Sequence, residues 1–444
     1  MAFILEGSQP SMQLENELFG VPTSLTDRWR TEHEKVNPVT VMNEDGASGD
    51  INFQIPASSN GLLSLADIYL EIEVAIKYKK AGDKTWEFIT DAQNVAPVNN
   101  FIHSLFSAVH VKAAGRLISD PGTYYAHRAY FDSILNTTSQ ARATQLTSSG
   151  FVLDDAPTYF ALTTATDAER KRKKWFLNGF TQLSGRLCVD LFEQSKPLIT
   201  GIPINIRLMM NKPEFFLRSW DAAAADVQYR AHIRNPRLCI RRYIPSPDYM
   251  LAVTNKLQHV SCKYHIERVL MRIFDLPKDL SHTTVPNLQI GQLPKIMYVG
   301  FIKSEDFQGN IKRSPFEFQH CSITQISVEV DGQGYPTKPY QPEFEKGRSI
   351  ECYDGLLDVL GRRGSPTGEL PFDRDGYCNG YTIFGFDLTP GGTGRGPLSL
   401  IKQGNLSVTV TFGKKLDVPM TMVCYMVYDS LLEFNHMRQL IADF

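Results

Sequence analysis

The chain contains 444 residues, which suggests two or three domains and is long enough to bury large hydrophobic cores. Apolar residues make up 42% of the chain and charged residues 21%, and the glycine and proline content excludes collagen-like and low-complexity classes. The net charge of −2 excludes a strongly basic nucleic-acid coat, but it is compatible with a local basic patch.

The seven cysteines are an odd number, and no two of them stand in a C-x-x-C spacing. This pattern argues against a disulfide framework and against a cysteine zinc site, so we expect reduced and mostly buried thiols. The N-terminus has no basic stretch followed by a long apolar run. The longest apolar run, at 420–428, is far short of the ~20 residues of a spanning helix. We therefore expect an intracellular product without a membrane span.

Alternation with a period of two residues dominates the chain and predicts half-buried β-strands. In the clearest case Ile68, Leu70 and Ile72 fall on one face, while Glu71 and Glu73 fall on the other. The same alternation predicts strands near residues 51–55, 68–78, 204–210, 326–330 and 406–412. Turn-forming residues separate these segments, and many short strands with such turns are typical of antiparallel sandwiches.

Helical spacing is rare in this sequence. Apolar residues predict one short helix near 130–135 and a second near 353–360, closed by Gly361. A third helix is expected at the end of the chain, near 431–441.

The two clear helices occupy equivalent places in a larger repeat. In each half a strand, a glycine turn, the helix, a loop and two further strands follow in the same order. Three pairs of landmarks have similar separations: 217 residues from Gly115 to Gly332, 197 from Asp190 to Asp387 and 202 from Ile206 to Val408. This offset indicates duplication of one β-rich unit, and chance similarity between strands is the alternative.

A unit of about 200 residues with about eight strands and one short helix is typical of a jelly roll. We therefore predict an all-β double jelly roll, with two eight-stranded antiparallel β-sandwich barrels and a few short helices in the loops. The expected organisation is an N-terminal arm over 1–45, jelly roll 1 over 46–247, and jelly roll 2 over 248–444 with a docked C-terminal segment. A proline cluster at 245–247 marks the boundary.

The sequence contains no catalytic constellation. His33 and Glu34 begin an H-E-x-x-H pattern, but Asn37 stands in place of the second histidine. There is no G-x-S-x-G motif, and the histidines do not recur at the repeat offset as a metal-binding double barrel would require. We predict no catalytic, cofactor-binding or metal-binding residues and no enzyme activity.

One strong charge run is present, and it is followed by two aromatic residues. It consists of Arg170, Lys171, Arg172, Lys173 and Lys174. Such a run can bind nucleic-acid phosphates or act as a nuclear import signal. The alternative is a solvated loop without a binding role.

Several strings of residues together resemble one protein family. The most distinctive string is 98–107, and the others are 18–22, 115–119, 123–130, 185–192, 291–295, 314–318, 380–389 and 423–444. In number and order they resemble the major capsid proteins of Polintons (Mavericks) and adintoviruses over nearly the whole chain. One departure is Ala114-Gly115, where the resemblance leads us to expect an Asn-Gly turn.

The resemblance implies a structural major capsid protein whose pseudo-hexameric homotrimers tile an icosahedral virion shell. The implied partners are further copies of the chain, penton proteins and minor capsid proteins, with packaged DNA contacted only indirectly and no cofactor. The implied location is the virion capsid, and assembly in the nucleus or the cytoplasm is left open. From the β pattern alone, a non-viral jelly-roll binding module, such as a lectin-like protein, is the alternative function.

Residues 1–45 lack clear alternation and carry mixed charges. We expect them to form an arm that lies along neighbouring subunits or along the floor of the shell, and the alternative is a short helix packed on its own domain. The candidate contact residues of the arm are Leu18, Phe19, Val21, Pro22 and Trp29.

Overall fold

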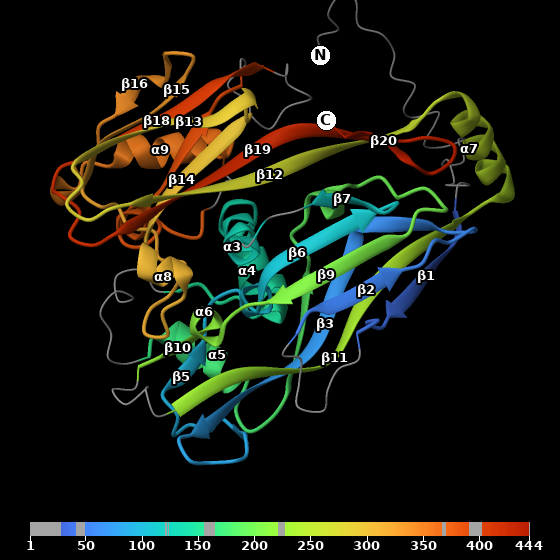
Figure 1. The fold of residues 1–444 in the computed structure, drawn as a ribbon, viewed down its shortest axis with the longest axis horizontal. Helices are drawn as coiled ribbons and strands as arrows, with labels where there is room; N and C mark the ends of the chain where they lie inside the picture. The colour runs from blue at the N-terminus through green and yellow to red at the C-terminus, as the bar shows by residue number, and fades with distance from the viewer. Residues whose placement is uncertain are drawn as a thin grey trace, which may run out of the picture.

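The computed structural model describes residues 28–40, 49–119, 122, 124–154, 165–220, 227–365, 370–389 and 402–443. Strands dominate these residues, and short helices lie in the connections between them (Figure 1). The main strands form two pairs of antiparallel sheets, one pair in each half of the chain.

In the first half, one sheet has the order β1-β11-β3, with β4 and β8 both paired to β3, and the other has the order β2-β9-β6-β7. The bounds are β1 Arg28–Val36, β2 Ile51–Ile55, β3 Leu62–Lys80, β4 Glu87–Phe88, β6 Phe106–Ala113, β7 Arg116–Ser119, β8 Thr181–Arg186, β9 Ile204–Met210 and β11 Val227–Pro245. A small additional sheet pairs β5 (Val95–Pro97) with β10 (Leu217–Ser219).

In the second half, one sheet has the order β12-β19-β14-β17, with β20 beside β19, and the other has the order β13-β18-β15-β16. The bounds are β12 Cys262–Leu276, β13 His282–Gln292, β14 Ile296–Lys303, β15 Ile323–Val330, β16 Gln333–Tyr340, β17 Ile383–Asp387, β18 Gln403–Phe412, β19 Met420–Phe434 and β20 Leu440–Asp443.

The two halves share one strand order. The sheet β1-β11-β3-β8 matches β12-β19-β14-β17 strand by strand, and β2-β9-β6-β7 matches β13-β18-β15-β16. Each half is therefore an eight-stranded jelly roll, which confirms the predicted double jelly roll. The match also supports the duplication inferred from the sequence spacing.

The two predicted internal helices are present at equivalent places. Helix α3 (Tyr125–Leu135) lies between β7 and β8, and α9 (Ile350–Val359) lies between β16 and β17. The remaining helices are α2 Phe101–Ser104, α4 Ser139–Ala143, η1 Gln145–Ser149, α5 Asp167–Lys174, η3 Asp190–Glu193, α6 Pro213–Phe216, α7 Pro247–His259, α8 Ser304–Gln308, η5 Phe344–Lys346 and α10 Arg374–Cys378.

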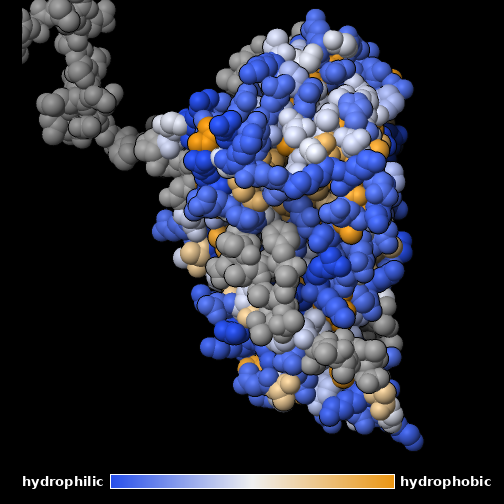
Figure 2. Space-filling model, turned by 90° about the vertical axis from the view of Figure 1, so that its left-hand side faces the viewer, coloured by the Kyte–Doolittle hydropathy of each residue, from blue (hydrophilic) through white to orange (hydrophobic). Residues whose placement is uncertain are grey.

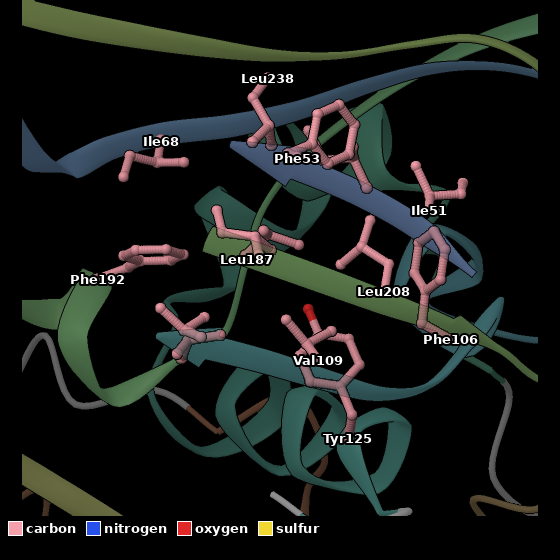
Figure 3. Close-up of a cluster of buried hydrophobic side chains, with 14 of the residues drawn as sticks. Ile51, Phe53, Ile68, Phe106, Val109, Tyr125, Leu187, Phe192, Leu208 and Leu238 are labelled. Carbon is pink, nitrogen blue, oxygen red and sulfur yellow. The ribbon is translucent and has the colours of Figure 1, made fainter. Parts of the chain in front are cut away.

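The hydrophobic core of each roll lies between its two sheets. On β2 the side chains alternate strictly between buried and exposed. In Figure 3, Phe53 and Leu208 of one sheet face Ile68 and Leu238 of the other. Each such buried side chain contributes about 1.5–3 kcal/mol, so the period-two pattern fixes which face of each strand turns inward.

Both rolls contain a two-residue hairpin turn at the same place. Ala114 and Gly115 connect β6 to β7 with φ of 49° and 78°, and Asp331 and Gly332 connect β15 to β16 with φ of 48° and 82°. Positive φ at both positions defines a type I′ turn, which matches the twist of the flanking strands. Ala114 adopts this conformation although alanine disfavours it.

The prediction of a third helix near residues 431–441 was wrong. Strand β19 continues to Phe434 and pairs with β12, so that Leu432 lies opposite Tyr264. The chain then turns back, and Leu440 of β20 pairs with Phe434. Leu432 and Phe434 are two residues apart and both are buried, so alternation against a neighbouring strand decides the structure here.

Part of the segment predicted as an N-terminal arm is a strand of the first jelly roll. Residues 28–36 form β1 and pair with β11, so that Val36 lies opposite Leu238. Ion pairs of Lys35 with Glu71 (2.8 Å) and of Glu34 with Arg242 (3.0 Å) hold the strand at the edge of its sheet. Charges on both faces of an edge strand hide the alternation in the sequence.

Two smaller expectations were also corrected. All seven cysteines are free, but only Cys352 and Cys424 are buried, and the other five are half-buried. Asp190 lies in η3, after the end of β8, whereas Asp387 is the last residue of β17, so these two carboxylates are not equivalent in the repeat.

The conformation of Ala114 leads to a first prediction. Replacing Ala114 with Asn, which tolerates positive φ, should stabilise the protein by about 0.5–1 kcal/mol, because the turn loses its backbone penalty. Gly115→Ala is the matched control and should destabilise the protein. The space around an added Cβ is open, so the cost comes from the backbone φ of 78°, which alanine disfavours. Denaturant unfolding measures both, and a destabilising Ala114→Asn would contradict the turn assignment.

Candidate functional site

Helix α3 lies between the two jelly rolls (Figure 1), and ten of its eleven residues are buried. Tyr125 and Ala129 belong to the core of the first roll. The helix residues that belong to the core of the second roll are Ala126, Tyr130, Phe131, Ile134 and Leu135. The helix therefore has two apolar sides and joins the two cores.

Aromatic rings contribute to the contact between α3 and the second roll. Tyr130 stacks on Phe316 with ring centroids 4.3 Å apart, and Phe131 meets Phe318 edge-on at 5.0 Å. The partners of both rings lie in the segment before β15. His127 Nε2 donates a hydrogen bond to the carbonyl of Pro315 in the same segment, 3.2 Å away. These contacts seat the helix in one orientation against the second roll.

A buried ion pair fixes the same helix to both rolls. Arg128 is 2% exposed, and its Nη2 lies 2.6 Å from the Asp190 carboxylate. Asp190 also accepts a hydrogen bond from the backbone N–H of Val269 on β12. One carboxylate thus connects α3, η3 and the first strand of the second roll.

A second carboxylate on α3 extends this network. The hydroxyl of Tyr425 on β19 donates a hydrogen bond to Asp132, 2.5 Å away. Burial raises the pKa of Asp132 to about 6, and the nearby charge of Arg128 acts in the opposite direction. These groups line a crevice of about 890 Å³ between the rolls, whose rim includes Arg186, Glu193 and His265.

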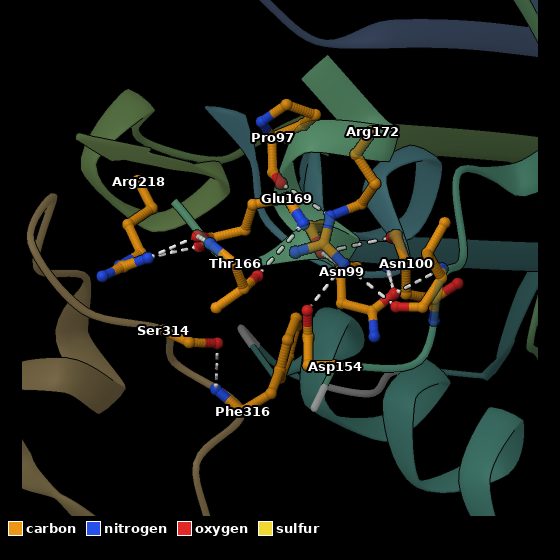
Figure 4. A network of polar contacts seen from close by, with 12 residues as sticks. Pro97, Asn99, Asn100, Asp154, Thr166, Glu169, Arg172, Arg218, Ser314 and Phe316 are labelled. Carbon is orange, nitrogen blue, oxygen red and sulfur yellow. Dashed lines mark hydrogen bonds and ion pairs between the residues drawn. The ribbon is translucent and has the colours of Figure 1, made fainter. Parts of the chain in front are cut away.

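A further polar network lies around α5 (Figure 4). Thr166 and Glu169 form a capping box that begins this helix. The Glu169 carboxylate also accepts hydrogen bonds from Nη1 of Arg218, at 2.5 and 2.6 Å. Nε of Arg218 donates a hydrogen bond to the backbone carbonyl of Lys312. The hydroxyl of Tyr381 donates a hydrogen bond to the backbone carbonyl of Asp154. Both bonds join the first roll to the second, so this network supports the same interface.

The predicted basic run forms most of α5, and the structure does not bring its five side chains into one patch. Arg172 is fully buried and donates to the carbonyl of Pro97 and to the Asp154 carboxylate. Lys173 is buried and donates to two backbone carbonyls, at 2.9 and 2.7 Å. Arg170, Lys171 and Lys174 are exposed. A role for these three in binding nucleic acid stays a prediction.

Most of the predicted arm residues lie outside the described part of the chain. Leu18, Phe19, Val21 and Pro22 precede residue 28, where the description begins. Trp29 lies on β1 and is 69% exposed. A contact between these residues and a neighbouring subunit stays a prediction.

Among the described residues, no group of three or more His, Cys, Asp or Glu side chains is placed to hold a metal ion. Two buried histidines have structural partners: His103 is hydrogen-bonded to Tyr125, and His127 to Pro315. Burial lowers their pKa values to about 4 and about 3, so both are neutral at pH 7. No helix in the described ranges is both long enough and apolar enough to cross a membrane.

Sequence reasoning missed the residues that join the rolls. Arg128 was noticed only inside a string that resembles a family. Asp190 was noticed as a landmark of the repeat, with a structural role favoured over acid–base chemistry, but without its partner. The available signal was their setting, because each is a charged residue among apolar neighbours (residues 125–131 and 187–192). Charges in such places are almost always paired when buried. Their mutual contact could not be predicted, since 62 residues separate them.

Comparisons with known proteins agree with this architecture. No protein-family model matches the chain. An uncharacterized protein of Caenorhabditis elegans is 24% identical over 419 residues, which cover 91% of this chain and 96% of that protein.

Two solved structures are similar over nearly the whole chain. A chain of the Sputnik virophage has a TM-score of 0.64 and 13% identity, with 99% of this chain and 93% of that chain covered. The major capsid protein of mavirus has a TM-score of 0.55 and 12% identity, with 100% and 96% covered. The protein therefore has the double jelly-roll fold of viral major capsid proteins.

The ion pair between the rolls can be tested by removing one partner. Asp190→Ala should lower the free energy of unfolding by about 3–5 kcal/mol, because it removes the short ion pair and leaves the buried Arg128 charge with only Asp132, 3.8 Å away. The control is Asp358→Ala, which breaks an ion pair with Arg363 whose side chains are 51% and 58% exposed. The control should cost less than about 1 kcal/mol. Similar losses in denaturant unfolding would contradict the assigned role of the pair.

A pH-dependent effect is expected at Glu317, in the segment that packs on α3. Glu317 is 3% exposed, and burial raises its pKa from 4.5 to about 7, against the opposing hydrogen bond from Gln319. The folded protein therefore binds this proton more tightly than the unfolded chain. The stability associated with the protonated carboxyl is present below pH 4.5 and is lost as the pH rises through 7.

Glu317→Gln should consequently raise the free energy of unfolding at pH 8 by about 1–3 kcal/mol and change it little at pH 4.5. Denaturant unfolding at the two pH values measures this difference. The exposed Glu351→Gln provides the control and should show no such difference. A loss of stability at pH 8 in the Glu317 variant would contradict this account, because it would mean that the charged carboxylate stabilises the folded protein.

Proposed function

We propose that this protein is a structural major capsid protein that forms pseudo-hexameric homotrimers, which tile an icosahedral virion shell. The observation that carries the proposal is the pair of jelly rolls with matching strand order, held together by α3. Three such chains around one axis place six similar barrels in a ring. A single gene product can then fill the hexagonal positions of a lattice.

The structural comparisons support this function because this chain has the same fold as the viral proteins that it resembles. The similarity to the mavirus major capsid protein covers 100% of this chain, so both rolls and their connection are included. A binding module with one barrel would need only half of this arrangement. The buried connection between the rolls suits a rigid building block, because its two barrels keep one relative orientation.

We further propose that the protein belongs to the Polinton and adintovirus lineage of capsid proteins. Support comes from the strings that suggested the resemblance, several of which form the connection between the rolls. The string 123–130 covers the first half of α3, 185–192 contains Asp190, and 314–318 contains the rings that pack on α3. The proposed partners are further copies of the chain, penton proteins and minor capsid proteins.

The proposed domain organisation follows the same scheme. An N-terminal segment precedes jelly roll 1, which extends to residue 247, and jelly roll 2, with its docked C-terminal segment, occupies 248–444. Because β1 begins at Arg28, we now place the start of jelly roll 1 at that residue instead of at 46. The proposed location is the virion capsid.

Light scattering after size-exclusion chromatography tests the proposed function. The expected mass is about 150 kDa, three times the chain mass of 50.1 kDa, and negative-stain images of the same peak should show pseudo-hexagonal particles or closed shells. A strict monomer at high concentration, without shells at any salt or pH, would contradict the proposal. That result would favour the alternative of a non-viral jelly-roll binding module.

A further inference from the structure

An apolar groove lies beneath α7, the helix that connects the two jelly rolls at one end of the molecule (Figure 1). Only Leu257 of this helix is buried, and Val253 is half-buried, so the helix touches the protein along a narrow stripe. The groove beneath it has a volume of about 450 Å³. Its apolar lining includes Leu62, Ile199 and Tyr264, which belong to both rolls.

Two of the large apolar side chains that line this groove are also exposed. Tyr249, on α7, is 40% exposed, and Val260, directly after α7, is 52% exposed. The opposite end of the molecule, shown in Figure 2, is mostly hydrophilic, with scattered apolar residues among the atoms that are coloured. An apolar groove flanked by exposed apolar residues indicates a surface that binds another segment.

The charged residues that line the groove are all basic. They are Lys196, Lys256 and Lys263. Lys263 is paired with Glu433, at 3.1 Å, and the acidic residue nearest in sequence on α7 is Asp248. A segment that fits this groove must therefore be apolar and acidic.

Residues 1–27 have this composition. They contain Glu6, Glu15, Glu17 and Asp27, and no lysine, arginine or histidine. Apolar residues stand between these charges, most densely at 3–5 and 18–22. The segment therefore combines the two properties that the groove requires.

The chain also enters the described structure at the correct place. The first residue of β1, Arg28, lies opposite Pro245, and α7 begins two residues later at Pro247. Thr31 and Leu62 both pair with Tyr243 of β11, so β1 and the groove lie on either side of one strand. Eight extended residues reach about 27 Å, which is ample for a segment that starts beside α7.

We propose that the N-terminal segment, residues 1–27, docks in the groove beneath α7 of its own chain. Its apolar side chains fill the groove, and its glutamates meet the surrounding lysines. This proposal takes the place of the contact with a neighbouring subunit that the sequence suggested for Leu18, Phe19, Val21 and Pro22. The groove of the same chain is favoured over that of another copy because the short connection to β1 gives an effective concentration of about millimolar. The segment would then tie together β1, the connecting helix and the beginning of the second roll.

Photo-crosslinking of the full-length protein tests this contact. Benzoylphenylalanine replaces Val253 in the groove, and the matched control carries it at Ile290, which is 70% exposed on β13. Trypsin releases residues 1–28 as one peptide, because Arg28 is the first basic residue of the chain. We expect this peptide to be crosslinked in the Val253 variant at the mass of a single chain.

The charge pairing is tested in the Val253 crosslinking background. Lys196→Glu with Lys256→Glu should lower the crosslink yield about threefold. Adding Glu15→Lys and Glu17→Lys should restore the yield, which is then summed over the peptides 1–15 and 18–28 because trypsin also cuts after the two new lysines. The charge-matched control is the pair Lys84→Glu and Lys338→Glu. Lys84 lies in a loop and Lys338 on β16, both are exposed, and the control should leave the crosslink yield unchanged.

Each other outcome overturns the proposal. A crosslink to the 1–28 peptide at twice the chain mass would assign the groove to the arm of a neighbouring copy. A yield no higher than that of the Ile290 control would remove the N-terminal segment as occupant. Neither result depends on trimer formation, so the assembly proposal is tested separately.

Discussion

Arg128 on α3 is 2% exposed, so its charge depends on the carboxylate of Asp190, 2.6 Å away. The helix is placed there because both of its sides are apolar and each fills the core of a different jelly roll. An unpaired charge at this interface would cost several kcal/mol. The orientation of the two rolls therefore depends on this ion pair, on the aromatic rings that pack on α3 and on the polar network around α5.

This arrangement explains how a duplicated fold becomes one rigid unit. A single jelly roll needs no helix with two buried sides, and the equivalent helix of the second roll, α9, buries only Cys352, Leu356 and Val359. The first roll thus supplies the connecting element and the second supplies the surface that receives it. A unit of this kind keeps its two barrels at a constant angle, as a pseudo-hexagonal lattice requires.

The sequence predicted the features that depend on local periodicity. Alternation located the long strands, and the spacing of Gly115 and Gly332 identified equivalent turns, which the structure shows as matching hairpins. It failed where neighbours in space decide the outcome. Charges on both faces hid β1, and pairing with β12 made residues 431–434 a strand instead of a helix. The contact of Arg128 with Asp190 depends on tertiary packing, which no local pattern encodes.

Cryo-electron microscopy of the purified oligomer tests most directly whether a rigid pair of jelly rolls is the unit of assembly. The account predicts a threefold particle with six barrels, in which α3 lies buried between the two rolls of every chain. Particles with two barrels, or rolls that adopt variable angles in different classes, would contradict it.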